Sequence, residues 1–135
     1  MILSFFIHDM RQFDWKLIRD VFTPSKISIS DLEIVPFLKE DETLTSGKDM
    51  EFHANELGAN FGQHHAEYIL INKDKMPKEW WEYTLVFPGT KWDDQSQNLH
   101  IACLNRYNQE WSLEFCFFNG LWFPNCRLVR LRKSC

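Results

Sequence analysis

One dipeptide near the C-terminus constrains the fold most: Asn119-Gly120, which stands between two aromatic-rich stretches, EWSLEFCFF and LWFPNCRLVRLR. Asn-Gly between apolar runs is the strongest short hairpin signal, because both turn residues must tolerate a positive φ. A two-residue turn here places Phe117 opposite Trp122. The sequence therefore predicts a C-terminal β-hairpin whose register is held by cross-strand pairs of large apolar side chains.

Several other segments have the length and alternation of strands. A run over 2–7 is apolar almost throughout, and 81–87 alternates apolar and polar residues before the sequence PGT ends it. The remaining predicted strands cover 26–38, 66–72 and 98–107. A slip of one residue at the turn in RYNQEW would exchange the two faces of the 98–107 strand, so its register stays open.

A single helix is predicted near the N-terminus. Asp9 fits an N-cap, since its carboxylate can accept the unpaired N–H groups of a first turn. Phe13, Leu17 and Val21 then recur at helical spacing, and Pro24 ends the pattern because it disfavours helical geometry at the residue before it. We expect an α+β fold, a mostly antiparallel β-meander sheet with this one N-terminal helix packed on one face.

Length and composition fit one compact unit. The chain has 135 residues, of which 44% are hydrophobic and 16% aromatic, enough to form a core. We therefore predict a single domain over 1–135, with an acidic irregular segment at about 39–62 that has the character of a long loop. No secretory signal or membrane-length apolar run is visible, and the four cysteines form no C-x-x-C pair. These features predict a cytoplasmic protein with reduced thiols and no membrane contact.

The stretch FHANELGANFGQHHAEY is the main candidate for chemistry. His53 precedes Glu56 by three residues and His64 precedes Glu67 by the same spacing, which on a helix puts each pair on one face. Zinc enzymes commonly take two ligands from one element and a third from elsewhere, but no H-E-x-x-H pattern is present. Polar loop histidines are the favoured interpretation, and a metal-dependent enzyme is kept as an alternative. Its candidate ligands are His53, His64, His65 and Glu67.

Other catalytic signatures are missing from the sequence. Cys103 and Cys116 lie in apolar strands, where a thiolate is disfavoured. There is no G-x-S-x-G, no S-x-x-K and no phosphate-binding glycine loop. Adjacent acids such as Asp93 and Asp94 are typical of solvated loops. We therefore predict no cofactor and favour a binding protein over an enzyme.

A basic C-terminal strand offers a second alternative, the binding of single-stranded nucleic acid. Arginines beside hairpin aromatics are typical of small β domains that hold single strands. Charge that protects an edge strand against association explains the same pattern, and the formal net charge of −4 argues against nucleic acid as the main partner. The candidate contacts are Arg106, Arg127, Arg130 and Arg132.

The segment INKDKMPKE followed by TLVF resembles the opening of small phage and prophage domains of unknown function. Asp74, Pro77 and the apolar strand after them carry the likeness, while Ile69 and Asn72 stand where that opening has tryptophan and valine. The closing motif of those domains is missing, so no residue and no function is carried over. The resemblance implies only a bacterial or phage accessory protein.

The division of charge favours a protein partner with a basic surface. Long-range charge speeds encounter but supplies limited affinity, so an exposed apolar anchor is expected beside the acidic segment. Of the adjacent tryptophans Trp80 and Trp81, we choose Trp80 as that anchor. The sequence thus predicts a small cytoplasmic protein-binding module of the immunity, inhibitor or phage accessory type. Its predicted partner-binding residues are Glu40, Asp41, Glu42, Asp49, Glu51 and Trp80.

Overall fold

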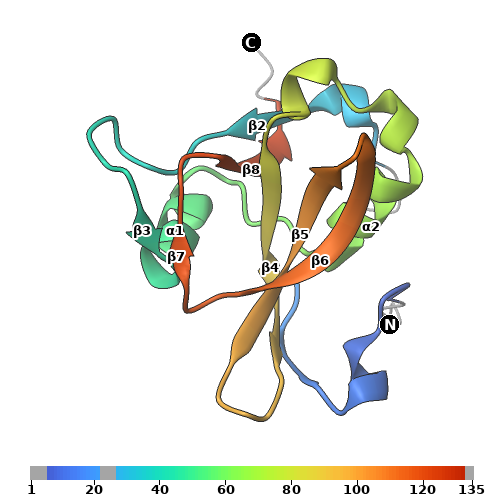
Figure 1. The fold of residues 1–135 in the computed structure, drawn as a ribbon, viewed down its shortest axis with the longest axis vertical. Coiled ribbons are helices and arrows are strands. Elements are labelled where there is room, and N and C mark those ends of the chain that lie inside the picture. The colour runs from blue at the N-terminus through green and yellow to red at the C-terminus, as the bar shows by residue number, and fades with distance from the viewer. Residues whose placement is uncertain (1–5, 22–26, 133–135) are drawn as a thin grey trace.

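The computed structural model describes residues 6–21 and 27–132, and this part of the chain is a mixed α+β fold with mostly antiparallel strands (Figure 1). A six-stranded sheet has the order β2-β8-β4-β5-β6, with β1 added beside β4, and β3 and β7 form a separate two-stranded ribbon. The strands are β1 (Lys16–Arg19), β2 (Leu32–Val35), β3 (Thr45–Ser46), β4 (Thr84–Asp93), β5 (Leu99–Tyr107), β6 (Glu110–Phe117), β7 (Leu121–Trp122) and β8 (Cys126–Leu131). The α-helices are α1 (Gly47–Glu56) and α2 (Gln63–Ile71), and short 3₁₀ helices cover Met10–Phe13, Ile29–Asp31, Lys73–Lys75 and Lys78–Trp80.

The meander is confirmed for β4, β5 and β6, which pair antiparallel in sequence order. The chain then leaves this order. β8 returns to lie parallel to β4 and antiparallel to β2, which places the C-terminal strand inside the sheet rather than at its edge.

The predicted N-terminal α-helix is wrong. Asp9 does cap a helix, accepting a hydrogen bond from the Arg11 N–H, but this is a single 3₁₀ turn that ends at Asp14 with a φ of 64°. The chain continues as β1, in which Leu17 lies opposite Trp92 of β4. Pairing with β4 supplies the backbone hydrogen bonds that a helix would have supplied, so helical spacing of apolar residues did not decide the structure. Phe13, expected to pack on the sheet, is 62% exposed.

The segment predicted to be irregular contains α1. Ser46 caps its start by accepting a hydrogen bond from the Asp49 N–H, and Met50 and Ala54 lie one turn apart on its buried face. Its end is a Schellman motif: Gly58, with a φ of 66°, donates to Asn55 O, and Ala59 donates to Ala54 O. The prediction of a long loop over 39–62 is therefore wrong for the residues of α1.

The predicted strand over 66–72 is also wrong, because these residues belong to α2. A short apolar run fits either a buried strand or a buried helix. Ala66 and Ile69, three residues apart, are both fully buried, which is the spacing of one helix face. Tertiary partners supply the missing cap at the helix start: Gln63 N–H donates to Thr90 Oγ1 over 2.8 Å.

The tight two-residue hairpin lies at Asn108-Gln109 rather than at Asn119-Gly120. Tyr107 of β5 pairs with Glu110 of β6, and the two residues between them have φ values of 50° and 66°. Such a turn matches the twist of the two strands. This turn settles the register that the sequence left open.

At Asn119-Gly120 the chain does turn, with Gly120 N–H donating to Phe117 O, but no φ in this turn is positive. The predicted pairing of Phe117 with Trp122 is wrong. Phe117 lies opposite His100 of β5, and Trp122 lies opposite Thr45 of β3. The two flanking strands therefore enter different sheets.

β4 also runs on through Pro88 and Gly89, which were expected to end it. The register with β5 shifts between Phe87 and Trp92, so Pro88 sits at an irregularity where a missing N–H costs little. Gly89 N–H donates to Phe61 O over 2.8 Å, and an added Cβ would meet Asn60 O, Val21 and Phe61. This close approach joins β4 to the segment before α2.

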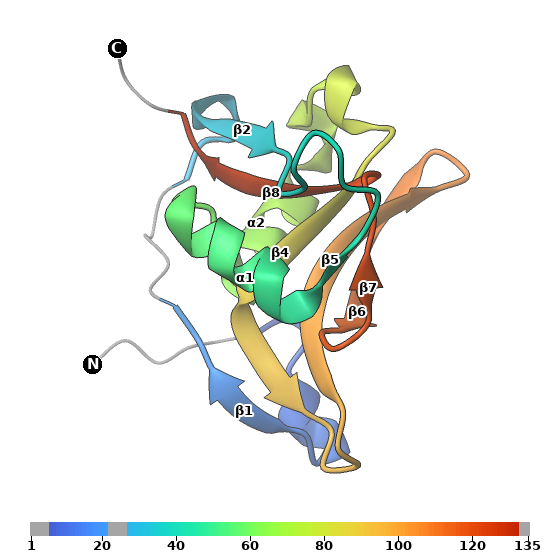
Figure 2. The same cartoon turned by 90° about the vertical axis from the view of Figure 1, so that its left-hand side faces the viewer.

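Each face of the large sheet carries one helix, as Figure 2 shows with α1 in front of the strands and α2 behind them. The α2 face buries a cluster that includes Leu85, Phe87 and Leu104, and the α1 face buries one that includes Val86, Ile101 and Leu128. Successive residues of β4 thus alternate between two cores. The predicted strand over 2–7 falls mainly on residues 2–5, outside the described residues, and Phe6 and Ile7 lie outside strands. Within the ranges described, no helix has the length and apolarity needed to cross a membrane.

Candidate functional site

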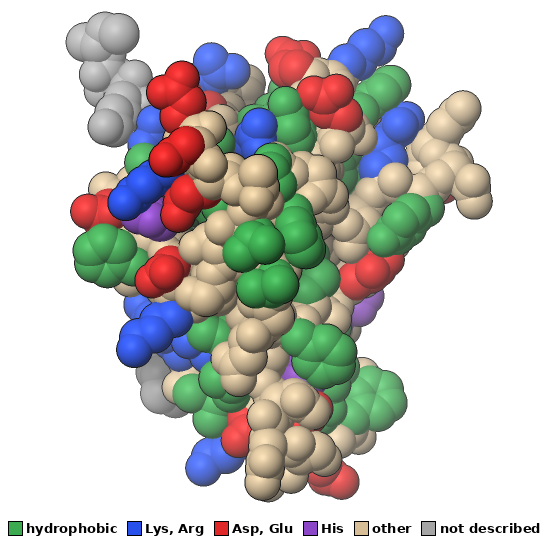
Figure 3. All heavy atoms as spheres, turned by 60° about the vertical axis from the view of Figure 1, so that its left-hand side comes forward, with side chains coloured by type: hydrophobic (Ala, Val, Ile, Leu, Met, Phe, Trp, Pro, Cys, Tyr) green, Lys and Arg blue, Asp and Glu red, His purple; other side chains and the backbone are tan. Residues whose placement is uncertain are grey.

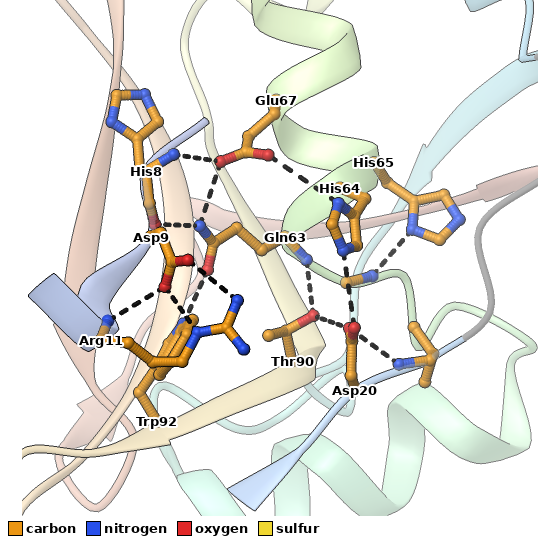
Figure 4. A network of polar contacts seen from close by, with 12 residues as sticks. His8, Asp9, Arg11, Asp20, Gln63, His64, His65, Glu67, Thr90 and Trp92 are labelled. Carbon is orange, nitrogen blue, oxygen red and sulfur yellow. Dashed lines mark hydrogen bonds and ion pairs between the residues drawn. The ribbon is translucent and has the colours of Figure 1, made fainter. Parts of the chain in front are cut away.

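A buried polar network surrounds the first turn of α2 (Figure 4). The side chain of Gln63 is fully buried, and its Nε2 donates to His8 O over 2.7 Å and to Glu67 Oε2 over 3.1 Å. Its Oε1 accepts from Trp92 Nε1 over 2.7 Å. Glu67 Oε2 also accepts from the His8 N–H over 2.8 Å. The network therefore uses both ends of Gln63 to hold the N-terminal segment against α2 and β4.

Asp20 extends this network at the start of α2. Thr90 Oγ1, which accepts from the Gln63 N–H, donates to Asp20 Oδ1 over 2.7 Å. His64 Nε2 lies 3.5 Å from Asp20 Oδ2, and its Nδ1 lies 3.9 Å from Glu67 Oε1. Burial would raise the pKa of Asp20, but the contacts with His64, Thr90 and the Val21 N–H together hold it below its usual range. Asp20 is thus a carboxylate that ties the end of β1 to α2.

His65 points away from His64 and has a structural partner of its own. Its Nδ1 accepts a hydrogen bond from the Gly62 N–H over 2.9 Å, and its ring stacks on Phe61 at 4.0 Å between ring centroids. Burial lowers the pKa of His65 to about 4, and the neighbouring His64 adds to the lowering. His65 is therefore neutral near pH 7 and acts as a helix cap.

The four residues proposed as alternative metal ligands are not brought together. His64 and Glu67 are neighbours in the network, and His65 turns to Gly62. His53 belongs to α1 and contacts Glu56 over 3.2 Å, near the molecular surface. No group of three or more His, Cys, Asp or Glu side chains in the described ranges could hold a metal ion.

Asp94 closes the loop between β4 and β5. Its Oδ1 accepts from the Ser96 N–H over 2.7 Å, and its Oδ2 lies 2.9 Å from His100 Nε2. The contact with His100 is the main cause that lowers the pKa of Asp94 to about 2. His100 is in turn stacked on Trp15 at 4.2 Å. This pair anchors a loop, since both of its members are engaged in holding local structure.

Two of the four arginines proposed for nucleic acid lie close together on the α2 side of the sheet. Arg106 stacks on Trp81 with its guanidinium 4.0 Å from the ring centroid, and Arg127 stacks on Tyr83 at 4.2 Å. Trp81 lines two neighbouring surface hollows, one with Arg106 and one with Arg127. Acidic side chains line the same hollows, so the positive charge is balanced: Glu79 and Glu82 in one, Asp74 and Glu110 in the other.

The other two arginines hold the far end of β8. Arg130 Nε contacts Glu33 Oε2 over 2.7 Å and its Nη1 donates to Leu57 O, which ties β8 to β2 and to the end of α1. Arg132 Nε donates to Leu32 O over 3.2 Å. The structure thus divides the four residues into an aromatic pair and a structural pair.

The residues of the predicted partner surface fall into two groups. Glu40 and Asp41 are exposed on the turn before β3, and Glu42 Oε1 caps that turn by accepting from the Lys39 N–H over 2.8 Å. Asp49 is exposed in the first turn of α1. Glu51 is already paired with cations of this protein, because its Oε2 contacts Lys91 Nζ over 3.0 Å and Arg19 Nη1 over 3.3 Å.

The expectation that Trp80 is exposed is wrong. Trp80 is only 3% exposed and belongs to the core on the α2 face, while Trp81 is 38% exposed. Trp80 is the last residue of the short helix over Lys78–Trp80 and Trp81 is its C-cap, so the Trp80 ring enters the core while the Trp81 ring stays at the surface. An apolar anchor beside the acidic turn must therefore come from another element.

The ribbon of β3 and β7 supplies apolar side chains at that place. Thr45 and Trp122 are paired and buried, so they face the core. Residues on either side of such a pair face outward. Leu121, opposite Ser46, is 57% exposed, and continuing the register by one residue puts Leu44 opposite Phe123.

We call Leu44, Leu121 and Phe123 the ribbon patch. All three are large apolar side chains and each is at least 45% exposed. Figure 3, in which the side carrying β3 and β7 comes forward, shows hydrophobic side chains gathered on this face with acidic side chains nearby. Leu44 of the ribbon patch follows closely after Glu40 and Asp41 in the chain, so the acidic turn leads into this end of the ribbon patch.

Sequence reasoning missed Gln63, Thr90 and Asp20, because their contacts join residues between 27 and 70 positions apart in the chain. It also missed the ribbon patch. An apolar residue in a strand-like stretch carries no sign of whether it will be buried, and only the pairing of β3 with β7 turns these side chains outward.

Comparison with known proteins gives no relative: no family model, no curated protein and no solved structure matches this chain.

Proposed function

We propose that this chain is a small protein-binding module, of the immunity, inhibitor or phage accessory type, and that it docks a partner through the ribbon patch and the acidic turn beside it. The partner surface would have an apolar centre and a basic rim. Cytoplasmic location and the absence of a cofactor are part of the same proposal.

The observation that carries the proposal is the outward face of the β3–β7 ribbon. Leu44, Leu121 and Phe123 are exposed on an element whose inner side is fixed by the buried pair Thr45 and Trp122. Large apolar side chains that cluster on a rigid surface lose little conformational entropy on docking. They are also the kind of group that anchors protein interfaces.

The acidic turn indicates the charge that the partner surface should carry. Glu40 and Asp41 are exposed, and in the described residues neither forms an ion pair. A basic surface would therefore be attracted to this side of the ribbon patch. Glu42 caps its own turn, and Glu51 is held by Lys91 and Arg19, so these two carboxylates support the surface rather than offer charge.

The experiment is affinity capture from a lysate of the source organism, followed by binding kinetics with the captured protein. The two test variants are the double variant Glu40→Lys/Asp41→Lys, which keeps the capping Glu42, and Leu121→Asp. The matched control is Ile71→Asp, which changes a similarly exposed apolar side chain at the end of α2. Circular dichroism checks that all variants keep the fold.

The proposal predicts that wild type and Ile71→Asp recover the same protein and that both test variants lose it. Charge reversal should mainly slow association and weaken its dependence on salt, whereas Leu121→Asp should mainly speed dissociation. Equal recovery of the partner by all four folded proteins would refute the proposal. Loss in the Ile71→Asp control as well would show that the contact lies elsewhere.

A second candidate function, binding of single-stranded nucleic acid, is supported by one observation. Arg106 on Trp81 and Arg127 on Tyr83 form two neighbouring cation–π stacks of the kind that can also receive bases. Fluorescence anisotropy with a labelled single strand at low and high salt tests it. Binding that weakens with salt and with Trp81→Ala would favour this function, and no binding at low salt would remove it.

A further inference from the structure

β6 forms one edge of the large sheet, and its hydrogen-bonding direction can be read from one bond. The sheet ends at β6, which pairs with β5 on one side. Phe118 N–H donates to Leu99 O over 2.8 Å, which makes this a hydrogen-bonded pair in the same register as the strands. Such pairs alternate along an antiparallel ladder. The backbone groups of the alternate residues Trp111, Leu113, Phe115 and Phe117 therefore point away from β5.

Most of these edge groups have no hydrogen-bond partner among the described residues. Phe117 O accepts from the Gly120 N–H, so this carbonyl at the C-terminal end of β6 is not free to bind another strand. The N–H and C=O groups of Trp111, Leu113 and Phe115 bond to no backbone or side chain of residues 6–21 and 27–132. An open row of this kind is a template for another strand.

The side chains along β6 give this edge a distinct pattern. Trp111, Leu113 and Phe115 face α2 and pack against the core on that side. Ser112, Glu114 and Cys116 alternate with them and therefore face the α1 side. Glu114 sits in the middle of the open stretch, its contact in the described structure being the Ser112 hydroxyl at 3.4 Å, without a cation in an ion pair.

Glu114 opposes pairing of this edge with the same edge of a second copy. In a two-fold antiparallel pair, residues whose backbones point outward must lie opposite each other. In the register centred on Glu114, the Glu114 carboxylates of the two copies lie directly opposite each other. If one strand slides by two residues along the other, in either direction, the two Glu114 side chains become diagonal neighbours. Like charges opposite each other on neighbouring strands are destabilising, and diagonal neighbours are only about 7–8 Å apart. A central charge on an edge strand is a known defence against self-association.

We propose that the free edge of β6 binds an extended segment of a partner protein that carries a lysine or arginine opposite Glu114. Backbone hydrogen bonds to Trp111, Leu113 and Phe115 supply the affinity. The cation facing Glu114 selects the partner and the register. This site lies on β6, apart from the ribbon patch on β3 and β7, and does not depend on the function proposed for that patch.

The probe is a nine-residue peptide of alternating threonine and valine with lysine at its centre, titrated into isotopically labelled protein and followed by the backbone amide signals. Two control peptides are used, one with glutamate at the centre and one with the lysine sequence but methylated backbone nitrogens. The protein variants are wild type and Glu114→Lys. Sedimentation measures whether the free protein pairs with itself.

The lysine peptide should shift the amides of Trp111, Leu113 and Phe115 and bind wild type more tightly than the glutamate peptide, by up to roughly fivefold for one cross-strand charge pair. Glu114→Lys should reverse that order, and the methylated peptide should not bind. Absence of shifts at these amides at millimolar peptide would overturn the edge site. Equal affinity of both charged peptides for both proteins would overturn the selection by Glu114, and a wild-type dimer with protected β6 amides would show that the occupant is a second copy.

Discussion

The indole N–H of Trp92 donates to Oε1 of Gln63 over 2.7 Å, and both side chains are fully buried. Trp92 is on β4 and Gln63 opens α2, so this bond joins the sheet to the helix at the place where the N-terminal segment also docks. A buried indole N–H needs a partner, and a buried amide needs several. Here the Gln63 oxygen accepts the hydrogen bond of the indole N–H, and the indole N–H satisfies the Gln63 oxygen.

Replacing Gln63 by alanine should destabilise the protein strongly. The change leaves Trp92 Nε1 and His8 O without their partner, removes one of the two hydrogen bonds to Glu67 Oε2, and opens a cavity as well. The expected loss is about 2–5 kcal/mol of the free energy of unfolding. Urea denaturation measures it, with Gln12→Ala on the exposed 3₁₀ turn as the control that should change stability by less than about 0.5 kcal/mol. A loss of the same small size for both variants would contradict the role given to the network.

The stability of the protein should fall as the pH falls from about 6.5 to about 4. The pKa of His65 is lowered to about 4 in the folded state by burial, while the unfolded chain titrates near the ordinary value of 6.5. Between these two values the unfolded state binds the extra proton, so acid favours unfolding. From near pH 7 to near pH 4.5 this one group should remove about 2 kcal/mol.

Urea denaturation at the two pH values, for wild type and His65→Gln, isolates this contribution. The variant should lose that part of the pH dependence, because glutamine does not titrate. Gln12→Ala, at an exposed side chain that does not titrate, is the control and should keep the wild-type pH dependence. An unchanged pH dependence in His65→Gln would show that His65 is not held neutral by the fold.

Gln109→Gly should stabilise the protein. Gln109 has a φ of 66° in the β5–β6 turn, a conformation that costs a non-glycine residue roughly 1 kcal/mol and costs glycine little. Gly120→Ala, in the turn that the sequence favoured, should change stability by less than about 0.5 kcal/mol, since the nearest atom to an added Cβ is at 3.4 Å and its φ is not positive. Thermal unfolding distinguishes the two sites, and the reverse order of effects would place the strained turn at Gly120.

The adjacent tryptophans should behave in opposite ways. Trp80→Ala removes a buried core side chain and should cost about 3–5 kcal/mol. Trp81→Ala removes a partly exposed ring whose main contact is the Arg106 guanidinium, so it should cost about 1 kcal/mol or less. Denaturation of the two variants, side by side, tests this; comparable losses would mean that Trp81 carries a packing role of its own.

The sequence by itself determined the class of fold and the places where strands form with strong alternation. β5 and β6 follow the pattern of Leu99 to Phe117, because side chains that alternate between two cores or between core and solvent need period two. A glycine such as Gly58 is a sequence signal for the end of a helix, since a residue with positive φ is needed to close a Schellman motif. These features depend on neighbours within a few residues, which is the range over which sequence patterns carry physical information.

The tertiary structure decided the rest. Residues 16–19 form a strand because they pair with the C-terminal end of β4, which supplies their backbone hydrogen bonds. Residues 63–71 form a helix whose start is capped by Thr90 and His65. Local patterns for helix and strand differ by little free energy, so partners distant in the sequence determined which formed. The same holds for the candidate sites: Trp80 is buried and the ribbon patch is exposed because of which elements pack against them, and no spacing within the sequence encodes that.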